Sequence, residues 1–179
     1  MTCWTRSLEI FSTISVFCDE NHVFEHSTQH YCAIEPTSVG RIPLDTLQQY
    51  INICAAMPMP AGDGSGCEYC GLNTYKRYTY HVAPPIFTVF VAHTTTTPDE
   101  GIQIVVDGHA VHYKIVGVVY YGHSHFTSRF VDEQRRIWYN DGIQLGRRSL
   151  LEGYIDGVDM TRDSAGKKPD ILMYRRADL

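Results

Sequence analysis

The sequence has little that would direct the protein to a membrane or to nucleic acid. No apolar run approaches the ~20 residues that a membrane-spanning helix needs, and the N-terminus lacks the basic segment followed by an apolar stretch that marks a secretory signal. The 15 Lys and Arg residues are outnumbered by 20 Asp and Glu residues, and the formal charge of −5 would repel a phosphate backbone. We therefore expect an intracellular protein, cytoplasmic or nuclear, with neither a nucleic-acid nor a membrane partner.

The composition fits one folded domain. The chain has 179 residues, of which 44% are hydrophobic and 12% aromatic, so it can bury a substantial core but is short for two domains. A chain of this size does not need disulfide bonds to fold, so free thiols, one nucleophile or a metal site are the better interpretations of its cysteines. There are six: Cys3, Cys18, Cys32, Cys54, Cys67 and Cys70.

The front of the chain shows apolar residues at helical spacing. Near its start they recur at steps of four and three: Trp4, Leu8, Phe11 and Ile14. This period predicts a helix with Cys3 at its N-terminal end. A second helix is predicted over residues 44–53, with Asp45 as the N-cap. The segment between them is polar and shows no clean period.

The rear of the chain has the composition of a sheet. A Pro-, Gly- and Ser-rich run over residues 57–66 predicts a flexible connection. Beyond it, β-branched and aromatic runs predict strands over residues 86–92, 102–106, 111–120, 125–131, 137–139 and 171–175. Turn residues such as Asp107-Gly108 separate most of these runs, which indicates an antiparallel meander. The predicted fold class is α+β, a single domain over residues 1–179 with a helical front (1–56) packed on an antiparallel sheet (67–179).

A hairpin in this sheet would bring a polar partner to one histidine. If the turn centres between Asp132 and Glu133, His125 lies opposite Asn140, and a slip of half a step places it opposite Asp141. A side-chain oxygen that accepts from one ring N–H would leave the other ring nitrogen free as a base.

Cys3 is the candidate nucleophile for that base. The positive end of a helix dipole favours thiolate over thiol, and the predicted first helix would place Cys3 there. Cys3, His125 and either Asn140 or Asp141 would then form a thiol-protease constellation.

The Cys-x-x-Cys pair Cys67 and Cys70 has the spacing of one half of a zinc site. A structural zinc needs four ligands, and the sequence contains no second pair of this spacing. Other candidate ligands are Cys18, His22, His26 and His30, which follow one another at steps of four, so that adjacent pairs could chelate a metal on a helix, and Cys32 and Cys54. We therefore expect no required cofactor, with a structural zinc held by Cys67 and Cys70 as the metal hypothesis.

The order of these motifs resembles that of the ubiquitin-specific proteases over almost the whole chain. Thr2-Cys3-Trp4 followed by Ser7-Leu8-Glu9 is similar to the cysteine box of that family, and residues 67–70 followed by 84–90 are similar to its fingers and the following strand. The histidine box is matched by residues 113–119, Gly122, His125-Phe126 and residues 138–141, and the closing strand by residues 171–176.

The resemblance implies a papain-like cysteine protease that cleaves after the C-terminal glycine of ubiquitin or a ubiquitin-like protein. By this match Cys3 is the nucleophile, His125 is the general base and then the acid, Asn140 is the orienting residue and Asp141 is the acidic residue beside it. Residues 1–56 would form a thumb-like part and residues 67–179 a fingers-and-palm-like part.

Two other functions remain open at this point. The chain begins two residues before Cys3, without the family's upstream oxyanion-binding asparagine, and loss of one such donor typically costs ~10²-fold to 10³-fold in turnover. A catalytically inactive ubiquitin-binding module is therefore one alternative. The other is a zinc-stabilised interaction domain in which Cys67 and Cys70 matter and Cys3 does not.

Overall fold

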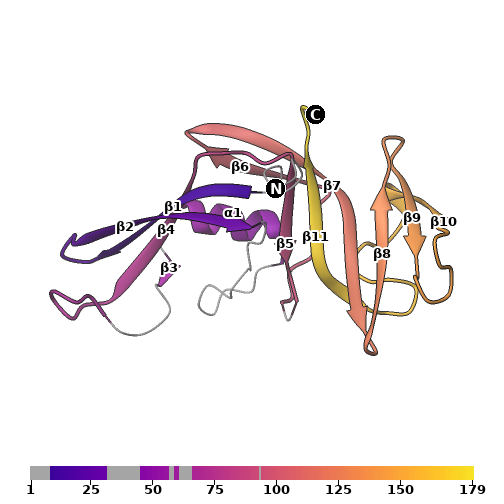
Figure 1. Cartoon of the computed structure of the whole chain (residues 1–179), viewed down its shortest axis with the longest axis horizontal. Helices are drawn as coiled ribbons and strands as arrows, with labels where there is room; N and C mark the ends of the chain where they lie inside the picture. The colour runs from indigo at the N-terminus through magenta and orange to yellow at the C-terminus, as the bar shows by residue number, and fades with distance from the viewer. Residues whose placement is uncertain (1–8, 32–44, 57–58, 61–65, 93) are drawn as a thin grey trace, which may run out of the picture.

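The computed structural model describes residues 9–31, 45–56, 59–60, 66–92 and 94–179. These residues form an elongated, sheet-rich molecule in which all the strands belong to one hydrogen-bonded sheet (Figure 1). The elements are β1 (Glu9–Cys18), β2 (Val23–Tyr31), α1 (Leu47–Ala56), β3 (Met59–Pro60), β4 (Thr74–Tyr80), β5 (Ile86–Phe90), β6 (Gly101–Val106), β7 (His109–Gly122), β8 (His125–Val131), β9 (Arg136–Asn140), β10 (Leu150–Tyr154), the 3-10 helix η2 (Ile155–Gly157) and β11 (Lys168–Arg176). Among the described residues, no helix has the length and apolarity to cross a membrane.

The sheet runs in the order β10-β9-β8-β7-β6-β4-β1-β2, and β11 pairs with both β5 and β7. Strands β1, β2 and β4 extend away from the rest on one side, and β8, β9 and β10 lie at the other end (Figure 1). The strands from β6 to β10 form an antiparallel meander, while β4 meets β6 in a single parallel pair.

The six strands predicted in the rear of the chain are confirmed as β5 to β9 and β11. The reason is local: β-branched and aromatic runs suit a pleated surface, and short turns separate them. Asp107 and Gly108, for example, both have positive φ (46° and 80°), which matches the two-residue hairpin turns that suit the twist of flanking strands. Strands β4 and β10 were not predicted.

The prediction of a helix at the front of the chain, with Phe11 and Ile14 in it, was wrong. Residues 9–14, including Phe11 and Ile14, belong to β1, which pairs with β2 along one edge and β4 along the other. The segment is rich in β-branched and aromatic residues, and strand pairing on both edges satisfies the hydrogen-bonding groups of its backbone. The helical spacing of a few apolar residues therefore did not predict its structure. The front part (1–56) therefore contains β1, β2 and α1, while residues 1–8 lie outside the described residues, as do most of the residues of the connection predicted over 57–66.

The second predicted helix is confirmed as α1, with a different cap. Thr46 is the N-cap, because its Oγ1 accepts a hydrogen bond from the N–H of Gln49 (3.3 Å). The Gln49 side chain accepts in return from the N–H of Thr46 (3.4 Å), which completes a capping box. The prediction of Asp45 as N-cap was therefore wrong by one residue. Leu47 and Tyr50 of α1 are buried in the core.

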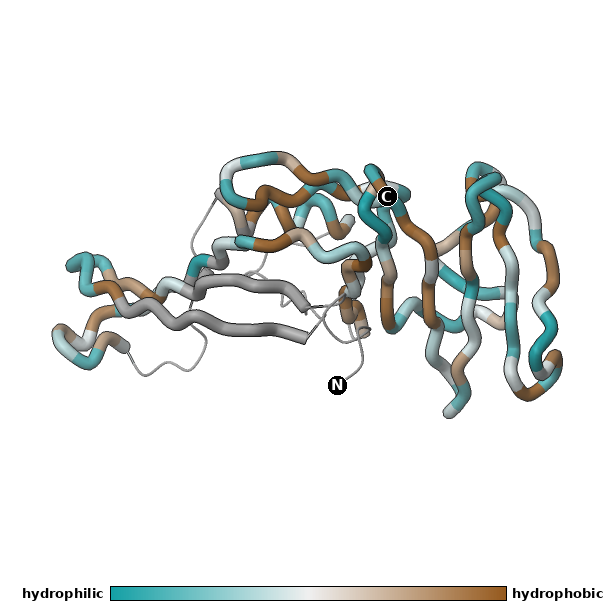
Figure 2. The backbone as a smooth tube through the Cα atoms, turned by 45° about the horizontal axis from the view of Figure 1, so that its top comes forward, coloured by the Kyte–Doolittle hydropathy of each residue, from teal (hydrophilic) through white to brown (hydrophobic). Residues whose placement is uncertain are grey.

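The core lies on one face of the sheet. Its buried members come from α1 and from β5, β6, β7, β9 and β11, and include Phe87, Ile104, Tyr120, Leu172 and Tyr174. Figure 2 shows hydrophobic stretches where β5, β7 and β11 lie together. The core fixes β7, and β7 pairs with β8, whose first residue lies in the candidate active site.

Candidate active site and metal centre

His125, the first residue of β8, contacts the carboxylate of Asp141, which directly follows β9. The distance from His125 Nε2 to Asp141 Oδ1 is 2.9 Å. The two residues are not directly opposite, because Ser128 pairs with Asn140 and the hairpin turn therefore centres on Gln134. The predicted register was wrong, but diagonal neighbours on one face of a sheet remain within side-chain reach.

Asp141 is held as a buried, ionised hydrogen-bond acceptor. Its side chain is only 4% exposed, and besides His125 it accepts hydrogen bonds from the N–H groups of Ile143 (3.0 Å) and Gln144 (3.1 Å). Burial raises the pKa of Asp141, but the hydrogen bonds from Gln144, His125 and Ile143 outweigh burial and lower the pKa below its usual value. The carboxylate therefore fixes the position of the imidazole.

This contact assigns the two ring nitrogens of His125. With the Nε2 proton donated to Asp141, the neutral ring carries its lone pair on Nδ1. No side chain in the described part of the chain hydrogen-bonds to Nδ1. Nδ1 is thus free to take up and return a proton, which is the chemistry of a general base and acid.

Asn140 directs its side-chain amide to the loop that follows β9. Its Nδ2 donates to the carbonyl groups of Gly146 (3.2 Å) and Arg148 (2.5 Å), so it holds the loop that follows β9. The structure therefore brings Asp141, and not Asn140, to the imidazole of His125.

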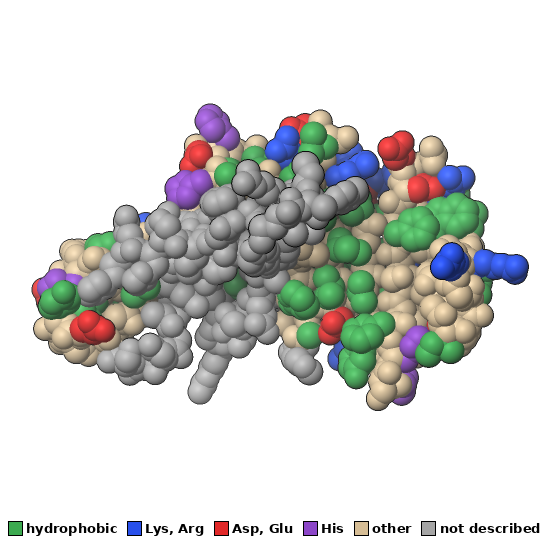
Figure 3. All heavy atoms as spheres, in the orientation of Figure 1, with side chains coloured by type: hydrophobic (Ala, Val, Ile, Leu, Met, Phe, Trp, Pro, Cys, Tyr) green, Lys and Arg blue, Asp and Glu red, His purple; other side chains and the backbone are tan. Residues whose placement is uncertain are grey.

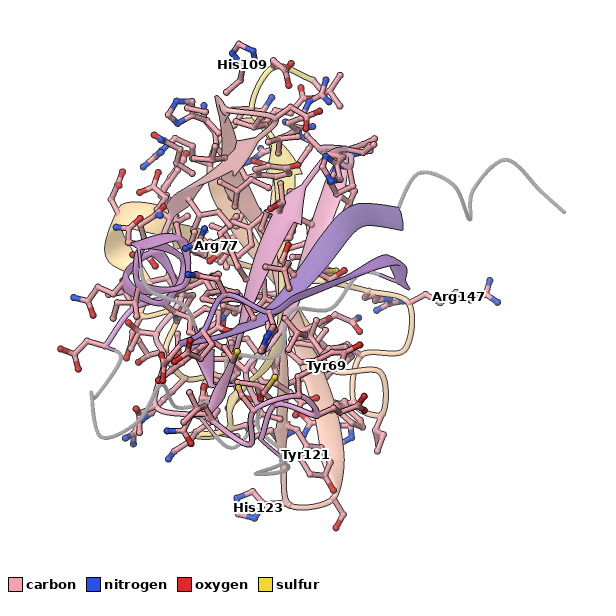
Figure 4. The ribbon with its side chains drawn as sticks, turned by 90° about the vertical axis from the view of Figure 1, so that its left-hand side faces the viewer. Tyr69, Arg77, His109, Tyr121, His123 and Arg147 are labelled. Atoms are coloured by element: carbon pink, nitrogen blue, oxygen red, sulfur yellow. The ribbon has the colours of Figure 1, made fainter. Side chains whose placement is uncertain are left out.

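A tight turn and a glycine position His125. His123 and Ser124, at the tip of the β7–β8 hairpin, both have positive φ (54° and 57°), an arrangement uncommon for residues other than Gly, Asn and Asp. Figure 4 shows His123 at this tip, near Tyr121. Gly122, which pairs with His125, leaves room for the side chain of Lys167, since an added Cβ would lie 3.0 Å from Lys167 Cγ.

The predicted nucleophile, Cys3, lies outside the described residues. The physical reason given for its activation was the N-terminus of a helix that included Phe11 and Ile14, and those residues are in β1. An activated thiolate at Cys3 therefore has no support from a helix dipole over residues 9–14.

A second cluster lies at the far end of the molecule, where β1 turns into β2. Cys18, His22, Cys67 and Cys70 place their ligand atoms within 4.8 Å of one another. The Sγ atoms of Cys18 and Cys70 are 3.5 Å apart, and Nδ1 of His22 lies 3.5 Å from the Sγ atoms of both Cys18 and Cys67. Zinc–sulfur bonds of about 2.3 Å in a tetrahedron place two sulfurs about 3.8 Å apart, so these four residues fit a zinc ion.

Local backbone geometry builds this cluster. Cys18 ends β1 and His22 follows it in a tight turn in which Asn21 has a positive φ of 58°. Cys67 and Cys70 lie in a second turn, closed by the hydrogen bond from the N–H of Gly71 to the carbonyl of Cys67 (2.7 Å). The ring of Tyr69, labelled in Figure 4, packs 5.3 Å from that of His22.

The cluster favours thiolate at Cys67 over Cys70. Burial raises the pKa of Cys67, but hydrogen bonds from the Tyr69 and Cys70 backbone, the Cys70 side chain and His22 lower it to about 6. A backbone hydrogen bond from Leu72 lowers the pKa of Cys70, yet burial and the sulfurs of Cys18 and Cys67 raise it to about 11. Because neighbouring thiolates repel one another, a bound cation would favour the ionisation of Cys67 and Cys70 together.

The sequence indicated only part of this ligand set. Cys67 and Cys70 were predicted, and Cys18 and His22 were noted as four residues apart, but as neighbours on a helix. In the structure a turn between two strands brings them together. Cys32, and the side chains of the other candidates His26, His30 and Cys54, lie outside what the structure describes.

No family model and no curated protein matches the chain. Several solved structures are similar to it in fold. The SAGA Ubp8/Sgf11/Sus1/Sgf73 DUB module bound to ubiquitin aldehyde is similar to this chain with a TM-score of 0.68 at 10% identity, over 98% of this chain and 43% of that chain. The same module with a substituted Ubp8, bound to monoubiquitin, gives 0.69 at 9% identity, over 98% and 42% of the two chains. The yeast module with a mutant Sgf73 gives 0.65 at 11% identity, over 98% and 42%.

These matches concern the fold of this chain and the share of the matched chains that it covers. This chain spans less than half the length of the chains that it matches. At about 10% identity the likeness concerns the fold alone: the described residues have the fold of part of a chain of the SAGA DUB module.

Proposed function

We propose that this chain functions in deubiquitination, as a thiol-dependent hydrolase that cleaves after the C-terminal glycine of ubiquitin or a ubiquitin-like protein. The observation that carries the proposal is the His125–Asp141 contact (2.9 Å), at the start of β8 in a deubiquitinase-like fold. Ubiquitin is the partner because two of the similar structures are bound to ubiquitin or ubiquitin aldehyde.

Each residue has one task in the proposed reaction. Nδ1 of His125 takes the proton of the Cys3 thiol, and the sulfur attacks the carbonyl carbon of the terminal glycine. The imidazolium returns that proton to the leaving amine as the carbon–nitrogen bond breaks, which leaves a thioester on Cys3. Water then attacks the thioester with His125 as base, which releases the ubiquitin carboxylate and the thiol. Asp141 keeps the ring oriented throughout.

A ubiquitin probe with an electrophilic C-terminus tests this assignment. We expect the probe to label the wild-type protein, to give no product with Cys3→Ala, and to label His125→Ala at least ~10²-fold more slowly, as removal of a general base does. His109→Ala is the matched control, because His109 is an exposed histidine at the start of β7, the end of that strand that lies away from the β7–β8 hairpin, and should label normally. Equal labelling of Cys3→Ala would show that Cys3 is not the nucleophile. Binding of unmodified ubiquitin without labelling would favour the inactive ubiquitin-binding module.

A second proposal rests on the cluster of Cys18, His22, Cys67 and Cys70. We infer that these residues hold a structural zinc ion that ties the β1–β2 turn to the segment preceding β4. Three thiolates and one imidazole suit zinc, and a closed four-ligand set is typical of structural rather than catalytic sites. The zinc-stabilised interaction domain is the alternative function that this cluster favours.

Metal analysis separates the two proposals. We expect about one zinc per chain in the purified protein and its loss in Cys67→Ser, since one ligand of four is removed. Cys3→Ser serves as the control and should retain the metal. A zinc content that is the same in Cys67→Ser and wild type would refute the assignment of this ligand set.

A further inference from the structure

The loop between β9 and β10 carries positive charge and no negative charge. We call residues 142–149 the Arg loop, because Arg147 and Arg148 are its only charged residues. Both arginines are exposed, and Figure 4 shows Arg147 extended away from the rest of the molecule. Figure 3 shows Lys and Arg side chains that project at the end of the molecule where β8, β9 and β10 lie.

No carboxylate of the described residues forms an ion pair with either arginine of the loop. Other arginines of the structure do pair with carboxylates: Arg129, Arg135, Arg136, Arg175 and Arg176. Along the chain, the acids nearest to the loop are Asp141 and Glu152. The first is bound to His125 and the second to Arg129. In a chain with a net charge of −5, two adjacent guanidinium groups are thus left to bind an external anion.

Hydrogen bonds fix the conformation of the Arg loop, although none of its residues is buried. Nδ2 of Asn140 donates to the carbonyl groups of Gly146 (3.2 Å) and Arg148 (2.5 Å). The N–H of Arg148 donates to the carbonyl of Leu145 (3.1 Å), and the N–H of Leu145 donates to the carbonyl of Asp141 (2.7 Å). A loop whose conformation is set before binding loses little conformational entropy when a partner binds.

The Arg loop and the imidazole of His125 share one anchor. Oδ1 of Asp141 accepts a hydrogen bond from Nε2 of His125 (2.9 Å). The same atom accepts hydrogen bonds from the N–H groups of Ile143 (3.0 Å) and Gln144 (3.1 Å). The start of the loop and the imidazole therefore both contact a single oxygen atom, and a molecule that binds at the imidazole lies next to the loop.

The chemistry of His125 indicates which part of a substrate lies there. In the proposed reaction, Nδ1 of His125 returns its proton to the leaving amine, while ubiquitin stays bonded to the sulfur of Cys3. The leaving amine belongs to the protein from which ubiquitin is removed. In an isopeptide bond this amine is the side chain of a lysine, so the residues that flank the lysine come nearest to the Arg loop.

We propose that the Arg loop binds acidic residues that flank the modified lysine of the conjugated protein. This inference rests on the proposed function, because the place of the leaving amine follows from the role of His125. Guanidinium groups bind carboxylates through two parallel N–H···O bonds, and complementary charge selects among partners. A nucleic-acid backbone is the less favoured anion, because the chain is acidic overall and the loop starts at the candidate catalytic pair.

Two fluorescent conjugates test the proposal. In each, ubiquitin is joined by an isopeptide bond to the lysine of a short peptide, with glutamates beside the lysine in one peptide and glutamines in the other. We expect the wild-type protein to cleave the glutamate conjugate with a KM about fivefold lower and an equal kcat, because exposed ion pairs form equally in the ground state and the transition state. The difference should disappear in about 0.5 M NaCl, which screens exposed charges.

Substitution of both arginines should remove the preference. The variant with Arg147→Gln and Arg148→Gln should cleave the two conjugates with the same KM. Arg147→Glu with Arg148→Glu should instead prefer a conjugate with lysines beside the modified lysine, a reversal that misfolding does not produce.

Arg77→Gln is the matched control and should keep the wild-type preference. Arg77 is an exposed arginine of β4, which lies at the opposite end of the molecule from β9 and β10 (Figure 1). Its guanidinium lies over the ring of Phe17 and forms no ion pair with a carboxylate of the described residues.

Binding measurements separate this proposal from the proposed function. Fluorescence anisotropy with Cys3→Ala gives the affinity for each conjugate without turnover, and the glutamate conjugate should bind about fivefold more tightly. If the wild-type protein cleaves neither conjugate, the proposed function fails, and the two affinities alone decide the role of the Arg loop.

Three results would overturn the proposal. One is an equal affinity of the Cys3→Ala protein for the two conjugates, and another is a preference that remains when both arginines are replaced by glutamine. The third is a preference that Arg77→Gln also removes. Binding of duplex DNA that requires both arginines, without a preference between the conjugates, would assign the Arg loop to a phosphate backbone instead.

Discussion

Arg129 offers a quantitative test of how β8 is fixed in place. Its guanidinium is buried (5% exposed) and donates to both carboxylate oxygens of Glu152 on β10 (2.5 and 3.2 Å). It also donates to the carbonyl groups of Asp159 (2.8 Å) and Arg162 (2.6 Å) and to the hydroxyl of Tyr120 (3.2 Å). One side chain on the strand that begins with the candidate base thus ties down the segment between η2 and β11.

The loss of unfolding free energy expected on removing Arg129 follows from the burial of its ion pair with Glu152. Removing one partner of a buried ion pair costs about 3–5 kcal/mol, because the other charge is left uncompensated. Glu152 is partly exposed and recovers some hydration, so we expect Arg129→Met to lower the free energy of unfolding by about 3 kcal/mol, the low end of that range. Adding Glu152→Gln removes the stranded charge, and the double variant should be more stable than Arg129→Met alone by about 1–2 kcal/mol.

Urea denaturation at neutral pH measures these differences. Arg135→Met is the control, because Arg135 pairs with Glu100 and Asp156 through side chains that are all exposed, and such pairs contribute little. We expect Arg135→Met to unfold at nearly the wild-type urea concentration. The reasoning fails if Arg129→Met resembles this control, or if the Arg129 and Glu152 substitutions are simply additive.

Three further predictions follow from individual contacts. Asp141→Ala should slow labelling by the ubiquitin probe at least ~10-fold while leaving the chain folded, as circular dichroism can verify, because it frees the ring of His125 to rotate. Gly117→Ala should cost about 1 kcal/mol in urea denaturation, since its Cβ would lie 2.6 Å from Cε of Met173, and the cost should vanish in a Met173→Ala background. Burial raises the pKa of Asp132, but hydrogen bonds from Trp138 and Arg136 outweigh it and lower the pKa to about 2, below its usual value of 3.8. Because the pKa of Asp132 is lower in the folded than in the unfolded state, its contribution to stability is fully present above about pH 4 and is lost as the pH falls toward 2. Thermal melts of the wild-type protein over this range should show the loss, and melts of Asp132→Asn should not.

The rear of the chain could be predicted because its signals are local. Strand propensity and short turns act between residues that are close in sequence, and β8 has the predicted bounds, His125–Val131. The front could not be predicted from the spacing of Phe11 and Ile14, because the edges of β1 are satisfied by β2 and by β4, more than 50 residues away.

The candidate sites show the same division. The sequence indicated that His125 meets a polar residue after a hairpin, but the turn centre, and hence the choice of Asp141 over Asn140, depends on a register that packing against the core selects. The metal ligands Cys18 and His22 could be named from the sequence, but not as partners of the Cys-x-x-Cys pair.

What the sequence determined by itself is the set of rear strands, one helix, a Cys-x-x-Cys pair and a histidine near a carboxylate. Each depends on neighbours along the chain, where the side-chain period and turn chemistry act directly. The tertiary structure alone decided the strand at the front, the four-residue metal cluster and the choice of Asp141 as the partner of His125. These depend on contacts between distant segments, whose free energy comes from burial and backbone pairing and leaves no mark in local spacing.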